Sequence, residues 1–122
     1  MFRIVNEEVK LVNPFPLSMS KMEAIDKSIK KFEFMSTHVD ELEWDGGPST
    51  CALCVWSKRE AKGKFISSCA VCPVAKLSDL YQCGDTPYYD VKNSLLAGSS
   101  HQTREFIDKE INFLKKVKEN EV

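Results

Sequence analysis

Five cysteines, all within one stretch of 33 residues, are the side chains of this sequence best suited to chemistry. They form two Cys-x-x-Cys pairs, Cys51 with Cys54 and Cys69 with Cys72, separated by fourteen residues, and Cys83 follows after ten more. A turn with two residues between cysteines aims both sulfurs at one point, and two such knuckles supply the four thiolates that tetrahedral zinc prefers. The gap between the pairs fits one β-hairpin, as in a zinc ribbon. The sequence therefore predicts a closed, structural zinc site.

Other assignments of the cysteines stay open. Cys83 is a spare thiol, or it replaces Cys69 as the fourth ligand. A [4Fe–4S] cluster is the alternative cofactor, because Cys72-Pro73 is similar to the Cys-Pro that closes ferredoxin-type ligand runs, and a cluster could use any four of the five. Disulfides or free buried thiols are disfavoured, because the number of cysteines is odd and nothing indicates secretion.

Catalytic chemistry has weaker support. Cys83 precedes an expected helix start, where a thiolate would be stabilised, but the sequence places no base beside it. His101 lies in the first turn of an expected helix and is a minor candidate for a metal ligand, while His38 is expected to be an ordinary boundary residue. Phosphate-binding loops, Ser-His-Asp order and HExxH motifs are missing from the sequence, so we expect a protein that is not an enzyme.

Composition bounds the class of protein. The chain has 122 residues, a formal net charge of −1, 43% hydrophobic and 29% charged residues, which predicts one globular domain over residues 1–122. General nucleic-acid binders are usually basic, so this charge disfavours them. Acids interrupt residues 1–8 before an apolar run develops, and no apolar stretch reaches the length of a membrane span. We expect a cytoplasmic protein without membrane contact, in a reducing compartment that favours metal over disulfides.

Three helices follow from local signals. Ser20 and Glu23 form a capping box that opens a helix over 20–43, with an apolar stripe at spacings of three and four. Pro87 at a first helical position and Gly98 as a cap bound a shorter helix over 86–97. A second capping box opens a helix over 100–119, whose apolar stripe matches the first helix in length. We expect the two long helices to pack together.

The remaining segments complete a mainly α fold. Residues 2–12 predict a small β-hairpin, and Phe15, between two prolines, is expected to pack on the core. Residues 49–83 form an inserted metal-binding knuckle module, with short strands at 55–56 and 65–66. Two groups of charges are expected to be solvated surface: the first-helix residues Lys27, Lys30, Lys31 and Glu33, and the acids Asp40, Glu41, Glu43 and Asp45.

Two regions are candidate contacts for a partner. The loop 58–64 lies between the cysteine pairs and carries four bases beside an aromatic residue, a pattern found in nucleic-acid contacts; these residues are Lys58, Arg59, Lys62 and Lys64, with Trp56 preceding them. A solvated loop tip is the plainer interpretation. Trp44 lies in the acidic stretch and is a candidate interface residue, or it caps the core.

The cysteine stretch resembles a group of small, uncharacterised cysteine-rich proteins of bacteriophages and prophages. The resemblance covers residues 20–117 and is carried by Cys51-Ala-Leu-Cys54, Cys69-Ala-Val-Cys72-Pro73, Cys83 and Thr86-Pro87-Tyr88. It implies a phage setting, and a cysteine–metal site that includes a residue equivalent to Cys83 in some members. The gap between the pairs is often shorter in these proteins, so the basic loop 58–64 is a departure. The resemblance implies no activity.

Three functions are consistent with these features. We expect first a zinc-stabilised, non-enzymatic protein that binds another protein, either of the host or of the phage. A nucleic-acid-binding zinc module that uses the 58–64 loop is the second hypothesis, and an iron–sulfur redox or sensor protein is the third. The sequence does not indicate an oligomeric state.

Overall fold

The computed structural model describes residues 2–16, 18–47, 50–61 and 87–121. Its elements, in chain order, are β1 (Phe2–Val5), β2 (Glu8–Leu11), α1 (Lys21–Ser36), the short 3-10 helix η1 (Val39–Glu41), α2 (Ala52–Ala61), α4 (Pro87–Leu96) and α5 (Ser100–Glu121). The described part is mainly helical, with four α-helices and a two-stranded antiparallel sheet. The mainly α class and the N-terminal hairpin are therefore confirmed. No helix in these ranges is both long and apolar enough to cross a membrane.

Helix α1 begins where its capping box predicts but ends earlier than expected. The Ser20 hydroxyl accepts a hydrogen bond from the Glu23 backbone N–H at 3.2 Å. At the other end, the Ser36 and Thr37 hydroxyls donate to the carbonyls of Glu33 and Phe34. Serine and threonine side chains that bond nearby carbonyls compete with the helical ladder. The predicted helix over 20–43 is therefore replaced by α1, a turn and η1.

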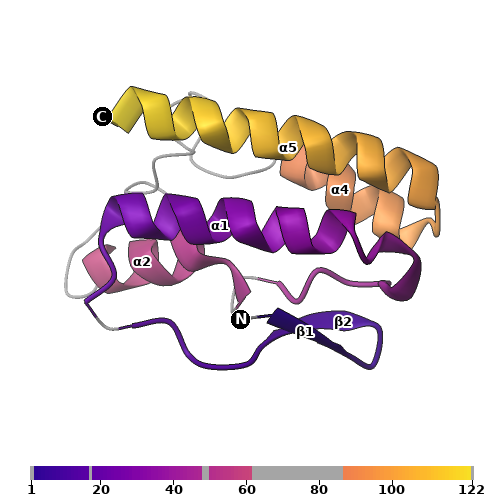
Figure 1. The fold of residues 1–122 in the computed structure, drawn as a ribbon, viewed down its shortest axis with the longest axis horizontal. Coiled ribbons are helices and arrows are strands. Elements are labelled where there is room, and N and C mark those ends of the chain that lie inside the picture. The colour runs from indigo at the N-terminus through magenta and orange to yellow at the C-terminus, as the bar shows by residue number, and fades with distance from the viewer. Residues whose placement is uncertain (1, 17, 48–49, 62–86, 122) are drawn as a thin grey trace.

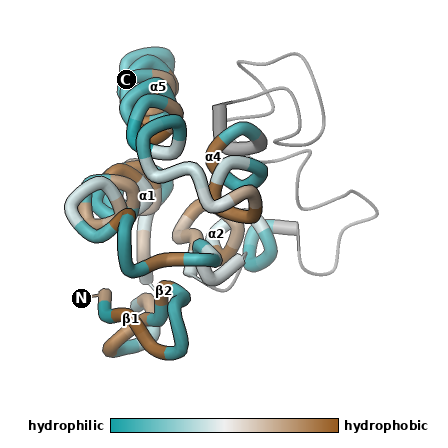
Figure 2. Tube along the Cα trace, turned by 90° about the vertical axis from the view of Figure 1, so that its right-hand side faces the viewer, coloured by the Kyte–Doolittle hydropathy of each residue, from teal (hydrophilic) through white to brown (hydrophobic). Residues whose placement is uncertain are grey.

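The two long helices lie side by side and run in opposite directions, as Figure 1 shows. Their apolar stripes meet in the core, where Ile25, Phe32, Ile107 and Leu114 are buried. Helix α4 packs on α5 and α2 packs on α1, so that in the end view of Figure 2 the four helices surround a common centre and the hairpin lies to one side. The predicted pairing of the two long helices is confirmed.

Helix α4 and helix α5 have the boundaries that local signals predict. Pro87 is the first residue of α4, and Gly98, with φ +74°, follows its end and donates its N–H to the Leu95 carbonyl. Helix α5 opens after Ser99, whose carbonyl accepts from the Thr103 N–H, and it continues slightly beyond the predicted end at residue 119.

The hairpin is held to the rest of the fold by backbone hydrogen bonds. Its two-residue turn places Asn6 and Glu7 at positive φ, 52° and 64°, as a type I′ turn requires. The Glu7 carbonyl accepts from the Glu43 N–H at 2.7 Å, and the Val9 N–H donates to the Trp44 carbonyl at 3.3 Å. The segment after η1 thus lies along the hairpin, which it joins by one isolated parallel bridge between Glu8 and Trp44.

Gly46 allows this close approach. Its φ is +87°, and a Cβ added there would lie 2.3 Å from the Val9 carbonyl oxygen. Any side chain would therefore both adopt an unfavourable backbone conformation and collide with backbone that cannot easily move. Glycine at this position follows from the contact between β2 and the segment after η1.

We predict that Gly46→Ala destabilises the protein much more than Gly98→Ala. Gly98 has a similar φ of +74° but no atom within 4 Å of an added Cβ, so its substitution should cost only the conformational penalty, about 1–2 kcal/mol. Gly46→Ala adds the collision with Val9 and should cost clearly more. Urea denaturation of both variants measures the difference. Equal losses would mean that β2 and the segment after η1 are not in contact.

Candidate functional site

The first cysteine pair lies at the start of α2. Cys51 directly precedes the helix, Cys54 lies in its first turn, and both side chains are half-buried. The Cys51 carbonyl accepts the first helical hydrogen bond, from the Val55 N–H at 3.0 Å. Residues 55–56 are therefore helical, and the predicted strand there is wrong.

Packing explains why these residues form a helix. Leu53 is buried against the core, and its backbone N–H donates to the buried Ser28 hydroxyl of α1 at 3.3 Å. The first turn of a helix leaves N–H groups without partners, and α1 supplies one of them. The preference of Val55 and Trp56 for strands is overridden by this tertiary contact.

The other predicted ligands, Cys69, Cys72 and Cys83, lie outside the described residues, as does most of the predicted 49–83 module. Among residues that the structure describes, no three His, Cys, Asp or Glu side chains converge closely enough to hold a metal ion. Cys51 and Cys54 thus contribute two thiols, half of the set that a tetrahedral site needs.

A buried ion pair lies next to the cysteines. The Lys31 ammonium lies 3.1 Å from the Asp45 carboxylate, and their side chains are 1% and 0% exposed. The other Asp45 oxygen accepts from the Gly47 N–H, and the Asp45 carbonyl accepts from the Thr50 hydroxyl. The prediction that both charges are solvated surface is therefore wrong.

This ion pair was not predicted from the sequence, although the spacing of residues on α1 indicates that Lys31 is buried. Lys31 follows Ser28 by three positions and precedes Met35 by four, so it lies on the buried face of α1 together with them. A lysine at such a position needs an acidic partner, because an unpaired buried charge is very costly. Which of the four nearby acids it binds depends on the tertiary fold.

The environment of Cys51 favours its thiolate. Hydrogen bonding from the Cys54 thiol, aided by the positive charge of Lys31 and by backbone N–H groups, outweighs burial and lowers the pKa of Cys51 to about 6. A thiolate is the form of cysteine that binds metals and attacks electrophiles.

Of the basic residues predicted to contact a partner, one is already engaged in contacts within the protein. Arg59 donates from its guanidinium to the carbonyls of Phe15 and Pro16, which ties α2 to the N-terminal loop. Trp56 is half-buried and packs against the core, whereas Lys58 is exposed. Phe15 is buried, which confirms the prediction that it packs on the core.

Lys62 and Lys64 lie outside the described residues. Of the remaining candidates from the sequence, Trp44 is half-buried, with the Lys92 ammonium 5.4 Å from its ring. His38 stacks on Phe34 with ring centroids 4.3 Å apart, as expected of a boundary residue, and His101 is exposed on α5.

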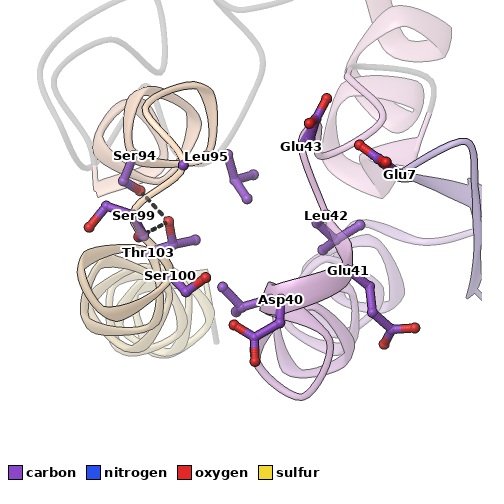
Figure 3. Close-up of a pocket in the computed structure, with 12 residues that line it drawn as sticks. Glu7, Asp40, Glu41, Leu42, Glu43, Ser94, Leu95, Ser99, Ser100 and Thr103 are labelled. Carbon is purple, nitrogen blue, oxygen red and sulfur yellow. Dashed lines mark hydrogen bonds between the residues drawn. The ribbon is translucent and has the colours of Figure 1, made fainter.

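A groove lies between the segment 39–44 and the connection from α4 to α5. It consists of two adjoining cavities, of about 340 Å³ and about 450 Å³, which share Leu42, Glu43, Leu95 and Gly98 in their walls. Leu42 and Leu95 point toward one another from opposite sides (Figure 3). We refer to this feature as the η1–α4 groove.

Comparison of the chain with protein-family models, with curated proteins and with solved structures found no significant match.

We predict that Lys31→Met destabilises the protein by about 3–5 kcal/mol, because it leaves the Asp45 carboxylate buried without its cation. Replacing both residues, as in Lys31→Met with Asp45→Asn, should recover part of this loss, since no uncompensated charge remains. A double-mutant cycle from denaturant unfolding measures the coupling. Additive losses would show that the two charges do not interact.

We predict that the rate at which iodoacetamide alkylates Cys51 in reduced, zinc-free protein rises with pH and has its midpoint at about pH 6. Peptide mass spectrometry at a series of pH values measures this rate. Cys54→Ala removes the main hydrogen-bond donor to the thiolate and should move the midpoint upward. A midpoint for Cys51 near that of an ordinary thiol would contradict the assigned environment.

Proposed function

We propose that this chain is a zinc-stabilised, non-catalytic protein that binds a partner protein. The observation that carries the metal part is the Cys51–Cys54 pair, one turn apart at the start of α2, half-buried and hydrogen-bonded in a setting that favours thiolate. Cys69 and Cys72 complete the ligand set by their spacing, with Cys83 as the spare thiol or the alternative fourth ligand.

The chemistry of the donors fits zinc. Four thiolates give a closed tetrahedral site with a net negative charge, which holds structure and leaves no position for substrate. The positive charge of Lys31 acts on Cys51 and partly offsets that negative charge. Groups near the ligands tune metal sites in this way.

A non-catalytic role is supported by the η1–α4 groove. Its hydroxyl groups are engaged in structure: Thr103 donates to the Ser94 hydroxyl at 2.8 Å, and Ser94 donates to the Val91 carbonyl at 3.0 Å. Neither of these two hydroxyls is directed at a base, and the carboxylate that the Ser100 hydroxyl bonds, that of Asp40, is paired with the Arg104 guanidinium. The groove is therefore suited to binding rather than to covalent chemistry.

The resemblance to phage and prophage proteins supports a host or viral protein as the partner. The compartment that fits this proposal is a bacterial cytoplasm, where thiols stay reduced and available to a metal. An iron–sulfur cluster in the same cysteines is the alternative cofactor.

Elemental analysis and a visible spectrum of anaerobically purified protein test the metal. We predict about one zinc per chain and no colour. Iron with sulfide and a broad absorbance near ~400 nm would replace zinc by a cluster, and absence of both would refute the metal.

We predict that Cys51→Ser loses the zinc and lowers the melting temperature, because metal binding is coupled to folding. Cys83→Ser is the matched control and should keep both metal and melting temperature if the two Cys-x-x-Cys pairs are the ligands. Loss of zinc from Cys83→Ser but not from Cys69→Ser would instead identify the alternative ligand set.

A further inference from the structure

The η1–α4 groove combines an apolar half with an acidic half. The apolar half is lined by Leu42, Trp44, Leu95 and Leu96. Leu42 and Leu95 are buried, so the half-buried Trp44 and Leu96, which is 65% exposed, are the apolar side chains that a ligand would meet. An exposed apolar surface rimmed by polar groups is typical of a site for a partner.

The acidic half holds two carboxyl groups that crowd one another. A side-chain hydrogen bond with the Glu43 carboxyl, together with the repulsion between the two charges, raises the pKa of Glu7. Both line the same cavity, and Figure 3 shows their side chains next to each other at its edge. Neither forms an ion pair with another described residue. A cation from outside would relieve this repulsion.

The backbone forces the two acids together. The Glu43 and Trp44 N–H groups both donate to the Glu7 carbonyl, and Glu7 itself has a φ of +64°. Glycine is the usual residue at this turn position, so a glutamate here costs conformational energy in addition to the repulsion.

At the α5 end of the groove, the negative charge of Asp40 is already balanced by a positive side chain. Asp40 accepts a hydrogen bond from Ser100 and lies 3.1 Å from the Arg104 guanidinium, which lowers its pKa. Within the described residues no acids converge on a point where a metal ion could be held. Glu7 and Glu43 are thus the acids of the groove that crowd one another, and Glu43 lines the same cavity as Leu96.

We propose that the η1–α4 groove binds a segment of a partner protein in which a large apolar residue is followed by Lys or Arg. The apolar side chain lies against Trp44 and Leu96, and the cation lies between Glu7 and Glu43. This proposal rests on the partner-binding role proposed above and specifies its surface and the chemistry of the partner.

The test is an NMR titration of the ¹⁵N-labelled full-length protein with three capped hexapeptides. GSLKRS carries both features, GSGKRS lacks the apolar side chain, and GSLEES reverses the charge. GSLKRS should give saturable shifts of the amides of residues 42–44 and 95–98. GSGKRS should bind about tenfold more weakly, as expected for loss of one buried aliphatic side chain, and GSLEES should give no saturable shift.

Charge variants sharpen the test. Glu43→Gln should weaken binding of GSLKRS about two- to fivefold, the effect of one exposed ion pair, while its melting temperature stays the same or rises because repulsion is relieved. Glu33→Gln is the matched control: it removes an exposed carboxylate of α1 outside the groove and should leave binding unchanged. Leu96→Ala should weaken GSLKRS but not GSGKRS.

Absence of a saturable shift with GSLKRS at about 1 mM, the weak end of specific binding, would overturn the proposal. Shifts confined to other surfaces, equal binding of GSLEES, or a lower melting temperature together with weaker binding in Glu43→Gln would do the same. The metal content of the labelled sample separates the two proposals, since no cysteine is among the described residues that line the groove. Zinc without peptide binding refutes only the groove, and peptide binding without zinc refutes only the metal.

Discussion

The buried ion pair between Lys31 and Asp45 is the interaction on which the arrangement of this protein depends. Lys31 comes from the middle of α1, and Asp45 comes from the segment that runs along the hairpin and then enters α2. One contact thus fixes three parts of the fold relative to one another. A buried pair adds little stability by itself, because both charges must be taken out of water. Its effect is on specificity: other positions of the segment would leave a buried charge without its partner.

Hydrogen bonds near Asp45 also fix the segments that precede and follow it in the chain. Toward the N-terminal side, Trp44 accepts from Val9 and so holds β2. Toward the C-terminal side, the Thr50 hydroxyl bonds to the Asp45 carbonyl directly before Cys51. The cysteine pair and the acidic edge of the groove are therefore positioned by the same few residues.

Local signals in the sequence predict much of the fold. The capping box at Ser20, the proline at residue 87 and the glycine at residue 98 each act within a few residues of their own position, and each gives a helix end that the structure has. The predictions that fail depend on distant partners. Val55 and Trp56 have strand-forming side chains, but contact with α1 makes them helical, and Lys31 is charged but lies on a buried face.

In the candidate site, too, the sequence predicts what depends on neighbouring residues and does not predict what depends on distant ones. Spacing alone identifies Cys51 and Cys54 as a pair, and their position at the start of a helix near a buried lysine comes only from tertiary structure. Glu7 and Glu43 are far apart in sequence, and no local pattern relates them. Their contact arises because a hairpin turn and the segment after η1 meet through backbone hydrogen bonds, which carry no side-chain signature.

The antiparallel packing of α1 on α5 has a consequence for biosynthesis. Helix α1 is translated early, but α5, which covers its apolar stripe, is the last helix of the described chain to leave the ribosome. At synthesis rates of about 5–20 residues per second, Ile25, Ile29 and Phe32 wait for several seconds without the helix that buries them. During that interval the part of the α1 stripe that α5 covers stays exposed, and apolar surface of this kind is what chaperones bind and what leads incomplete chains to aggregate.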